Sequence, residues 1–212
     1  MNPYDPPTSE ARAPKRSAQN IFWTRAFVTM TVIRLGLIAA LLATSAISRN
    51  VDAEASVAST LAEAWQWGSV ATQITFFASL VCAGRWLASM WGALPREDWK
   101  VGSIATTPQS AVAYLCIPFF NYYWMFAMNL ALCDRYESRA YGPWRKETDL
   151  SGRGLVSSAA GLSLVGLVGA LAAGSPLGVL QYAITVAAPL FWIFYMRHLD
   201  AMRARLEHGE SR

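Results

Sequence analysis

The stretch LVSSAAGLSLVGLVGALAAGSPLGVLQYAITVAAPLFWIFYM, residues 155–196, contains no charged side chain. It holds two apolar runs, Leu155–Ala173 and Leu177–Met196. Each run has about the 20 residues that a helix needs to cross a bilayer. Only Gly174, Ser175 and Pro176 separate them, and these residue types favour a tight turn. The two runs are therefore expected to form an antiparallel pair of membrane-spanning helices.

Two further apolar runs, Ala26–Ile47 and Trp67–Trp86, precede this pair. Over all 212 residues, 54 % are hydrophobic and 15 % are charged, with a mean hydropathy of +0.25. Soluble domains have roughly 25 % charged residues, so the composition indicates a membrane protein. We expect one membrane domain, residues 21–200. It follows a disordered tail rich in Pro and charge, residues 1–20, and precedes a short polar tail, residues 201–212.

The distribution of Lys and Arg decides how a fifth apolar stretch, residues 109–133, is placed. If it crossed the membrane, nine basic residues would lie outside, against the positive-inside rule: Arg135, Arg139, Arg145, Lys146, Arg153, Arg197, Arg203, Arg205 and Arg212. If it dips in and returns, only Arg49 of the 18 basic residues lies outside. Pro118 and Asn121 interrupt the stretch and favour a break there. A kinked full span is the alternative.

The sequence therefore predicts an all-α membrane protein of the inner (cytoplasmic) membrane, with both termini in the cytoplasm. Four transmembrane helices, about 26–47, 67–86, 155–173 and 177–196, would be joined by one re-entrant helical hairpin, about 109–133, broken at a Pro-Asn elbow. Its basic cytoplasmic loop would carry Arg135, Arg139, Arg145, Lys146 and Arg153. The net charge is +4, and the basic residues lie beside the apolar runs, where such residues orient a membrane protein and contact anionic lipid. We therefore expect no nucleic-acid partner.

Small residues recur at helical spacing in the third span, which predicts a face that another helix approaches closely. These residues are Ala159, Ser163, Gly166, Ala170 and Ala173. Packing within the chain is one interpretation, and a seam between two copies is the other.

Three polar residues within the spans define a second candidate feature, a polar path through the bundle: Arg34, Gln73 and Gln181. For Arg34 the alternative is that its long side chain reaches back to the near interface, since a charge at membrane depth is costly.

The run TPQSAV, residues 107–112, leads into IPFFNYYWMF, residues 117–126. This pattern resembles the signature of a family of uncharacterised bacterial multi-pass inner-membrane proteins. Some members carry a GYF-like or zinc-ribbon head at the N-terminus. The resemblance implies an inner-membrane domain of unknown function, with no catalytic residues to carry over. Arg135 stands where a polar Asn is usual. From the residues themselves, Pro118, Asn121, Tyr122, Tyr123 and Trp124 form either a structural elbow or a small-molecule or ion site.

Recognisable motifs for catalysis or cofactor binding are missing from the sequence. Asp and Glu occur in none of the predicted spans, and the only two histidines, His198 and His208, lie near the C-terminus. We expect no cofactor, no metal site and no enzymatic activity. The leading hypothesis is a structural or accessory protein that engages a protein partner or anionic lipid through its basic loops. The alternative is a small transporter or channel, which would need a homo-oligomer because four spans enclose a thin pore.

Overall fold

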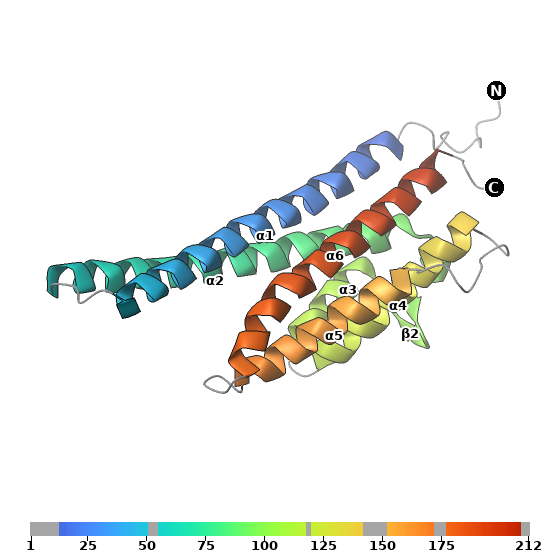
Figure 1. Ribbon diagram of the computed structural model, residues 1–212. Helices are drawn as coiled ribbons and strands as arrows, with labels where there is room; N and C mark the ends of the chain where they lie inside the picture. Colours follow the sequence, from blue (N-terminus) through green and yellow to red (C-terminus); the bar gives the residue numbers. More distant parts are fainter. Residues whose placement is uncertain (1–12, 51–54, 118–119, 142–151, 172–176, 209–212) are drawn as a thin grey trace, which may run out of the picture. The chain divides into compact units, whose positions relative to one another are not determined.

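The computed structural model describes residues 13–50, 55–117, 120–141, 152–171 and 177–208, which are helical apart from one β-hairpin (Figure 1). Its helices are α1 (Ala13–Asn50), α2 (Ala55–Ala93), α3 (Pro108–Ala113), α4 (Phe120–Tyr141), α5 (Gly152–Leu171) and α6 (Leu177–Glu207). Two single 3-10 turns are η2 (Arg96–Asp98) and η3 (Tyr114–Cys116), and the hairpin pairs β1 (Lys100–Val101) with β2 (Ile104–Ala105). The prediction of an all-α fold is confirmed for these residues.

The chain divides into two compact units, one made of residues 1–24 and 84–212 and the other of residues 25–83. In the smaller unit, α1 and α2 run antiparallel. Arg34 of α1 lies beside Phe76 of α2, whereas Leu41 lies beside Gly68. A β-carbon at Gly68 would lie 2.7 Å from Leu41 Cδ2, so glycine permits the close approach of the two helices.

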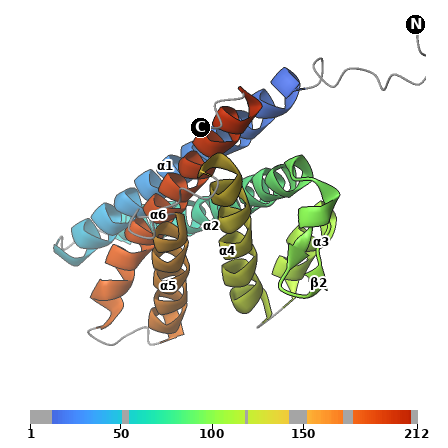
Figure 2. The ribbon, with the colours of Figure 1, turned by 90° about the vertical axis from the view of Figure 1, so that its right-hand side faces the viewer.

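In the larger unit, α5 and α6 form the antiparallel pair that the sequence predicts. The indole nitrogen of Trp192 donates to the Ser163 hydroxyl at 3.3 Å, and Gly166 lies against Ile184. Helix α4 packs against both (Figure 2). Tyr195 of α6 is fully buried, and its hydroxyl donates to the carbonyl of Asn129 in α4 at 2.9 Å. The core of this unit thus lies among α4, α5, α6 and the end of α2, where Met90 and Trp91 are fully buried.

The chain reverses direction between η3 and α4. The Trp124 indole nitrogen donates to the carbonyl oxygen of Ala111 at 3.3 Å, and its ring lies 4.7 Å from that of Tyr114. In one straight helix, residues ten apart would be separated by about 15 Å. Residues 109–133 are therefore two helical pieces folded against each other. Residues 118–119, at the predicted elbow, lie outside the described residues.

The motif TPQSAV supplies the start of α3. Thr107 is the N-cap residue, with its hydroxyl accepting from the Ser110 amide at 3.1 Å, and the Ser110 hydroxyl accepts in return from the Thr107 amide at 2.8 Å. Pro108 occupies the first helical position, where its missing amide hydrogen costs nothing. Ala111 is fully buried beneath Trp124. Both halves of the motif therefore belong to one structural unit.

Several helices extend beyond their predicted ends. Residues 13–20 belong to α1 although a disordered tail was expected, and Asn20 is buried. Helix α4 continues to Tyr141 into the predicted polar loop, and α6 continues to Glu207 through most of the predicted C-terminal tail. Helix α2 is continuous to Ala93, seven residues beyond the end of the predicted span 67–86. Polar partners from other helices stabilise these extensions.

Two helices in the described part of the chain are long and apolar enough to cross a membrane, by length and composition alone: residues 19–48 and 56–93. They contain the predicted spans 26–47 and 67–86. The spans predicted at 155–173 and 177–196 correspond to α5 and the first part of α6, and residues 172–176 between them lie outside the described residues. These two spans stay predictions.

We expect Trp124→Phe to lower the free energy of unfolding by about 1 kcal/mol, because it removes the indole donor to Ala111 but keeps an aromatic ring beside Tyr114. Chemical denaturation of the purified chain in detergent measures this. Trp65→Phe is the matched control, since Trp65 is 54 % exposed. Equal effects of the two substitutions would contradict the role given to this hydrogen bond.

Candidate functional site

A polar junction of buried and half-buried side chains joins three segments of the larger unit. The Asp200 carboxylate of α6 accepts from the Thr24 hydroxyl of α1 at 2.5 Å and from the Trp86 indole of α2 at 2.9 Å. One turn away, the Ser89 hydroxyl of α2 donates to the Asn20 side-chain oxygen of α1. We call these five residues the Asp200 cluster. It fixes the start of α1 against the end of α2 and the second half of α6.

Burial dominates the acid–base behaviour of the Asp200 cluster. Loss of water raises the pKa of the Asp200 carboxyl above its ordinary value of 3.8, and the bonds from Thr24 and Trp86 and the charge of Arg203 only partly offset this. An ionised carboxylate is thus held in place at a cost in stability. The cluster is suited to holding helices together. Folding also increases the affinity of the Asp200 carboxylate for a proton.

A second buried carboxylate, Glu137 of α4, ties α4 to α5 and α6. Its Oε1 atom accepts from the Gly152 amide at 2.7 Å and from the Cys133 thiol at 3.1 Å, and it lies 3.4 Å from His198 Nε2. Gly152 is the first residue of α5, so the carboxylate also meets the positive end of that helix. Glu137 is 1 % exposed, and its donors come from α4 and α5, with the His198 ring of α6 beside it. This arrangement is a structural anchor.

The short segment before the β-hairpin is attached to α4 by ion pairs. Arg139 Nη2 lies 2.5 Å from Asp98 Oδ2, and Arg135 Nη1 lies 3.7 Å from Asp98 Oδ1. On the neighbouring helix, Arg153 makes two 2.6 Å bonds to the Asp134 carboxylate. Three members of the predicted basic loop are therefore partnered by carboxylates within the chain. Arg145 and Lys146 lie outside the described residues.

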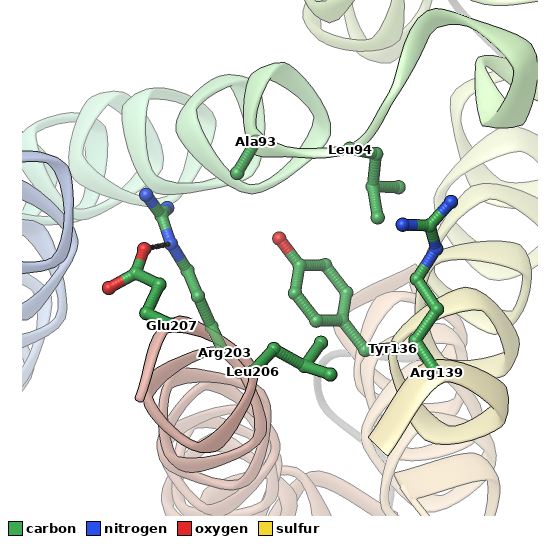
Figure 3. Close-up of a pocket in the computed structure, with 7 residues that line it drawn as sticks. All are labelled: Ala93, Leu94, Tyr136, Arg139, Arg203, Leu206 and Glu207. Atoms are coloured by element: carbon green, nitrogen blue, oxygen red, sulfur yellow. Dashed lines mark hydrogen bonds and ion pairs between the residues drawn. The ribbon is translucent and has the colours of Figure 1, made fainter. Parts of the chain in front are cut away.

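A pocket of about 440 Å³ opens beside these ion pairs, between the end of α2 and the last turns of α4 and α6 (Figure 3). The Tyr136 side chain stands between Arg139 and Arg203, and Arg203 donates to Glu207 at 2.8 Å. The pocket is lined by Ala93, Leu94, Tyr136, Arg139, Arg203, Leu206 and Glu207. Its polar groups are two guanidinium groups, one carboxylate and the Tyr136 hydroxyl, and the guanidinium donors suit recognition of an anion.

The predicted polar path is only partly described. Arg34 places its guanidinium carbon 4.6 Å from the centre of the Phe76 ring, a cation–π contact that neither interpretation of Arg34 anticipated. Gln73 is exposed and makes no hydrogen bond within the described part of the chain. The side chain of Gln181 lies outside the described residues.

Of the predicted elbow, Tyr123 is exposed and Trp124 is buried. Pro118 and the side chains of Asn121 and Tyr122 lie outside the described residues. On the small-residue face, Ala159 is buried, and Ser163 and Gly166 face α6 of the same chain. The side chain of Ala170, and Ala173 altogether, lie outside the described residues.

Sequence reasoning did not anticipate the burial of Asn20, Glu137 and Asp200, because each lies just beyond an apolar run, where a solvated helix end is the usual interpretation. The sequence contained one signal of this burial, which is the helical spacing of these residues from apolar neighbours. Cys133 and Glu137 are four residues apart, and Tyr195, Leu199, Met202 and Arg203 continue the buried face of α6. No protein-family model, curated protein or solved structure matches this chain. The family resemblance of residues 107–126 stays a prediction.

We expect the stability of the protein to fall as the pH rises from about 4 through the raised pKa of Asp200. The folded state binds this proton more tightly than the unfolded state, so stability is fully present below the unfolded pKa and is lost above the folded one. Asp200→Asn should flatten this part of the profile, since an amide can accept from Trp86 and donate to the Thr24 hydroxyl. Thermal unfolding in detergent at a series of pH values measures it. An unchanged profile in the variant would refute the assignment.

Glu137→Ala should lower the free energy of unfolding by about 2–3 kcal/mol, because it leaves the Gly152 amide and neighbouring donors buried without their acceptor. Glu97→Ala is the control, since its side chain is 80 % exposed and only 3.9 Å ion pairing is lost. Its effect should stay below about 0.5 kcal/mol. Denaturant titration of both variants tests this, and a Glu137 effect as small as that of Glu97 would contradict the anchor role.

Proposed function

We propose that this chain is an integral protein of the cytoplasmic membrane, with both termini inside, that acts as a structural or accessory protein. It would hold a basic surface against anionic lipid head groups or a protein partner. Two features support the proposal: apolar side chains exposed along the helices, and basic side chains at the predicted cytoplasmic ends that make no ion pair with any described residue.

Apolar exposure is extensive in both units. In the smaller unit, Trp67, Ile74 and Phe77 are 63–70 % exposed, and only 11 % of the apolar window of α1 is buried. In the larger unit, Leu164, Val165, Val186, Leu190 and Phe194 are exposed on α5 and α6. Water-soluble monomers rarely leave so many large apolar side chains together on the surface. A lipid environment removes the cost of this exposure.

The accessory role is supported by a difference among the basic residues, some of which are ion-paired within the chain while others are not. Arg135, Arg139, Arg153 and Arg203 are ion-paired within the chain, whereas Arg85, Arg96, Lys100 and Arg197 are exposed and make no ion pair within its described part. We call the second group the open basic set. Arg85 lies at the last turn of the predicted span 67–86, Arg96 and Lys100 lie in the loop after it, and Arg197 follows the predicted span 177–196. Cations so placed gain about 1 kcal/mol each from an anionic leaflet.

The threading is tested with a single cysteine. In a cysteine-free background, Ser138→Cys on the exposed side of α4 should resist a membrane-impermeant maleimide added to intact spheroplasts, and should react after the membrane is opened. A crossing by residues 109–133 would instead place this cysteine outside and label it at once. Release of the chain from membranes by alkaline carbonate would refute the integral-membrane assignment itself.

We expect Arg85→Gln combined with Lys100→Gln to reduce the number of anionic phospholipids that co-purify in a mild neutral detergent, since each lost cation removes about 1 kcal/mol of attraction. The control, Arg135→Gln with Arg153→Gln, removes the same charge from residues already paired with Asp98 and Asp134. Quantitative lipid mass spectrometry compares them. Equal lipid loss in the two variants would contradict the open basic set, and a stoichiometric protein in the same sample would identify the partner instead.

A further inference from the structure

The pocket beside Tyr136 collects two arginines from different helices. Arg139 approaches from the last turn of α4 and Arg203 from α6, on either side of the Tyr136 ring (Figure 3). Arg203 is 3 % exposed, so its charge is held away from water. The volume, about 440 Å³, lies within the range of pockets that bind small ligands.

Both guanidinium groups keep unused hydrogen-bond donors. Arg203 donates through Nε to Glu207 and through Nη1, weakly at 3.5 Å, to the Ser89 carbonyl, which leaves Nη2. Arg139 is held through Nη2 by Asp98 and Glu97, which leaves Nε and Nη1. Within the described part of the chain these remaining donors have no partner. Guanidinium forks of this kind match the oxygens of a phosphate.

The charges around the pocket favour an anion. The charged side chains that line the pocket are Arg139, Arg203 and Glu207, which leaves an excess of one positive charge. Asp98, which does not line the pocket, pairs with both Arg139 and Arg135. Glu97 also lies 3.9 Å from Arg139, but its side chain is 80 % exposed and water screens it. Burial raises the pKa of the Tyr136 hydroxyl far above its ordinary value, so this group stays neutral beside the arginines. Its hydroxyl donates to the Met90 carbonyl at 2.9 Å.

The remaining wall is apolar, formed by Ala93, Leu94 and Leu206. We propose that this pocket binds the phosphate group of an anionic amphiphile between Arg139 and Arg203, with the apolar wall contacting the adjoining carbon chain. The assignment of the phosphate to a lipid rests on the proposed membrane location. The pocket itself does not, because a free phosphate or a soluble phosphate ester offers the same oxygens.

Native mass spectrometry of the full chain in neutral detergent tests the proposal with three probes: phosphatidylglycerol, zwitterionic phosphatidylcholine and inorganic phosphate. We expect one phosphatidylglycerol to bind saturably and to persist in high salt, because a buried contact is screened less than a surface contact. Arg139→Gln should weaken it about tenfold, the loss of one charge-assisted hydrogen bond. Leu206→Trp should abolish it by filling the pocket while leaving both arginines in place.

Arg153→Gln is the control, because it removes one positive charge from an arginine that does not line the pocket. Thermal unfolding of each variant confirms that it is folded. Saturable binding of inorganic phosphate alone, lost in Arg139→Gln, would keep the site and assign it to a soluble phosphate. Lipid binding that is equal in all variants, or no phosphate-dependent binding at all, would overturn the proposal. Neither result bears on the carbonate and maleimide tests of membrane location.

Discussion

A carboxylate removed from water must be given hydrogen-bond donors, and the larger unit is organised around two places where this happens. Asp200 receives donors from α1 and α2, and Glu137 receives them from within α4 and from the start of α5, with His198 of α6 beside it. Each anchor joins elements that are distant in sequence. Breaking either leaves a buried charge uncompensated, which costs more than a neutral hydrogen bond contributes. The geometry of the pocket between α2, α4 and α6 depends on both anchors.

At the end of α2, side chains from α4 and α6 take the place of a C-terminal cap. The Tyr136 hydroxyl donates to the carbonyl of Met90, Arg203 contacts that of Ser89, and the Trp99 indole donates to that of Leu94 at 3.0 Å. The last four carbonyls of a helix have no partner inside that helix, and the carbonyl of Met90 is one of them. Side chains from α4 and α6 therefore complete α2, and the arginine that closes the helix also lines the pocket. Structural and binding roles share residues here.

The apolar runs and the Gly-Ser-Pro turn were sufficient to predict the helices and the antiparallel pairing of α5 with α6. The described helical pieces end at Cys116 and begin again at Phe120, on either side of Pro118, whose role as an elbow stays a prediction. The extensions of α1, α4 and α6 could not be read in this way, because Asn20, Glu137 and Asp200 look solvated until their distant partners are known. For the same reason the basic loop looked open, whereas Arg135 and Arg153 have carboxylate partners. The β-hairpin was missed because each strand has two residues, too few to show alternation.

The Asp200 cluster also constrains the order of events during synthesis. Thr24 and Asp200 are separated by 176 positions, so the hydrogen bond between them can form only after almost the whole chain has been synthesised. At ordinary rates of translation this delay is roughly 10–35 s. During that interval Thr24 lacks its Asp200 partner, whereas Asn20 can pair with Ser89 as soon as α2 has been made. Completion of the cluster is therefore a late, C-terminal event in biogenesis, and a nascent chain that ends before α6 would expose polar groups that a quality-control protease can recognise.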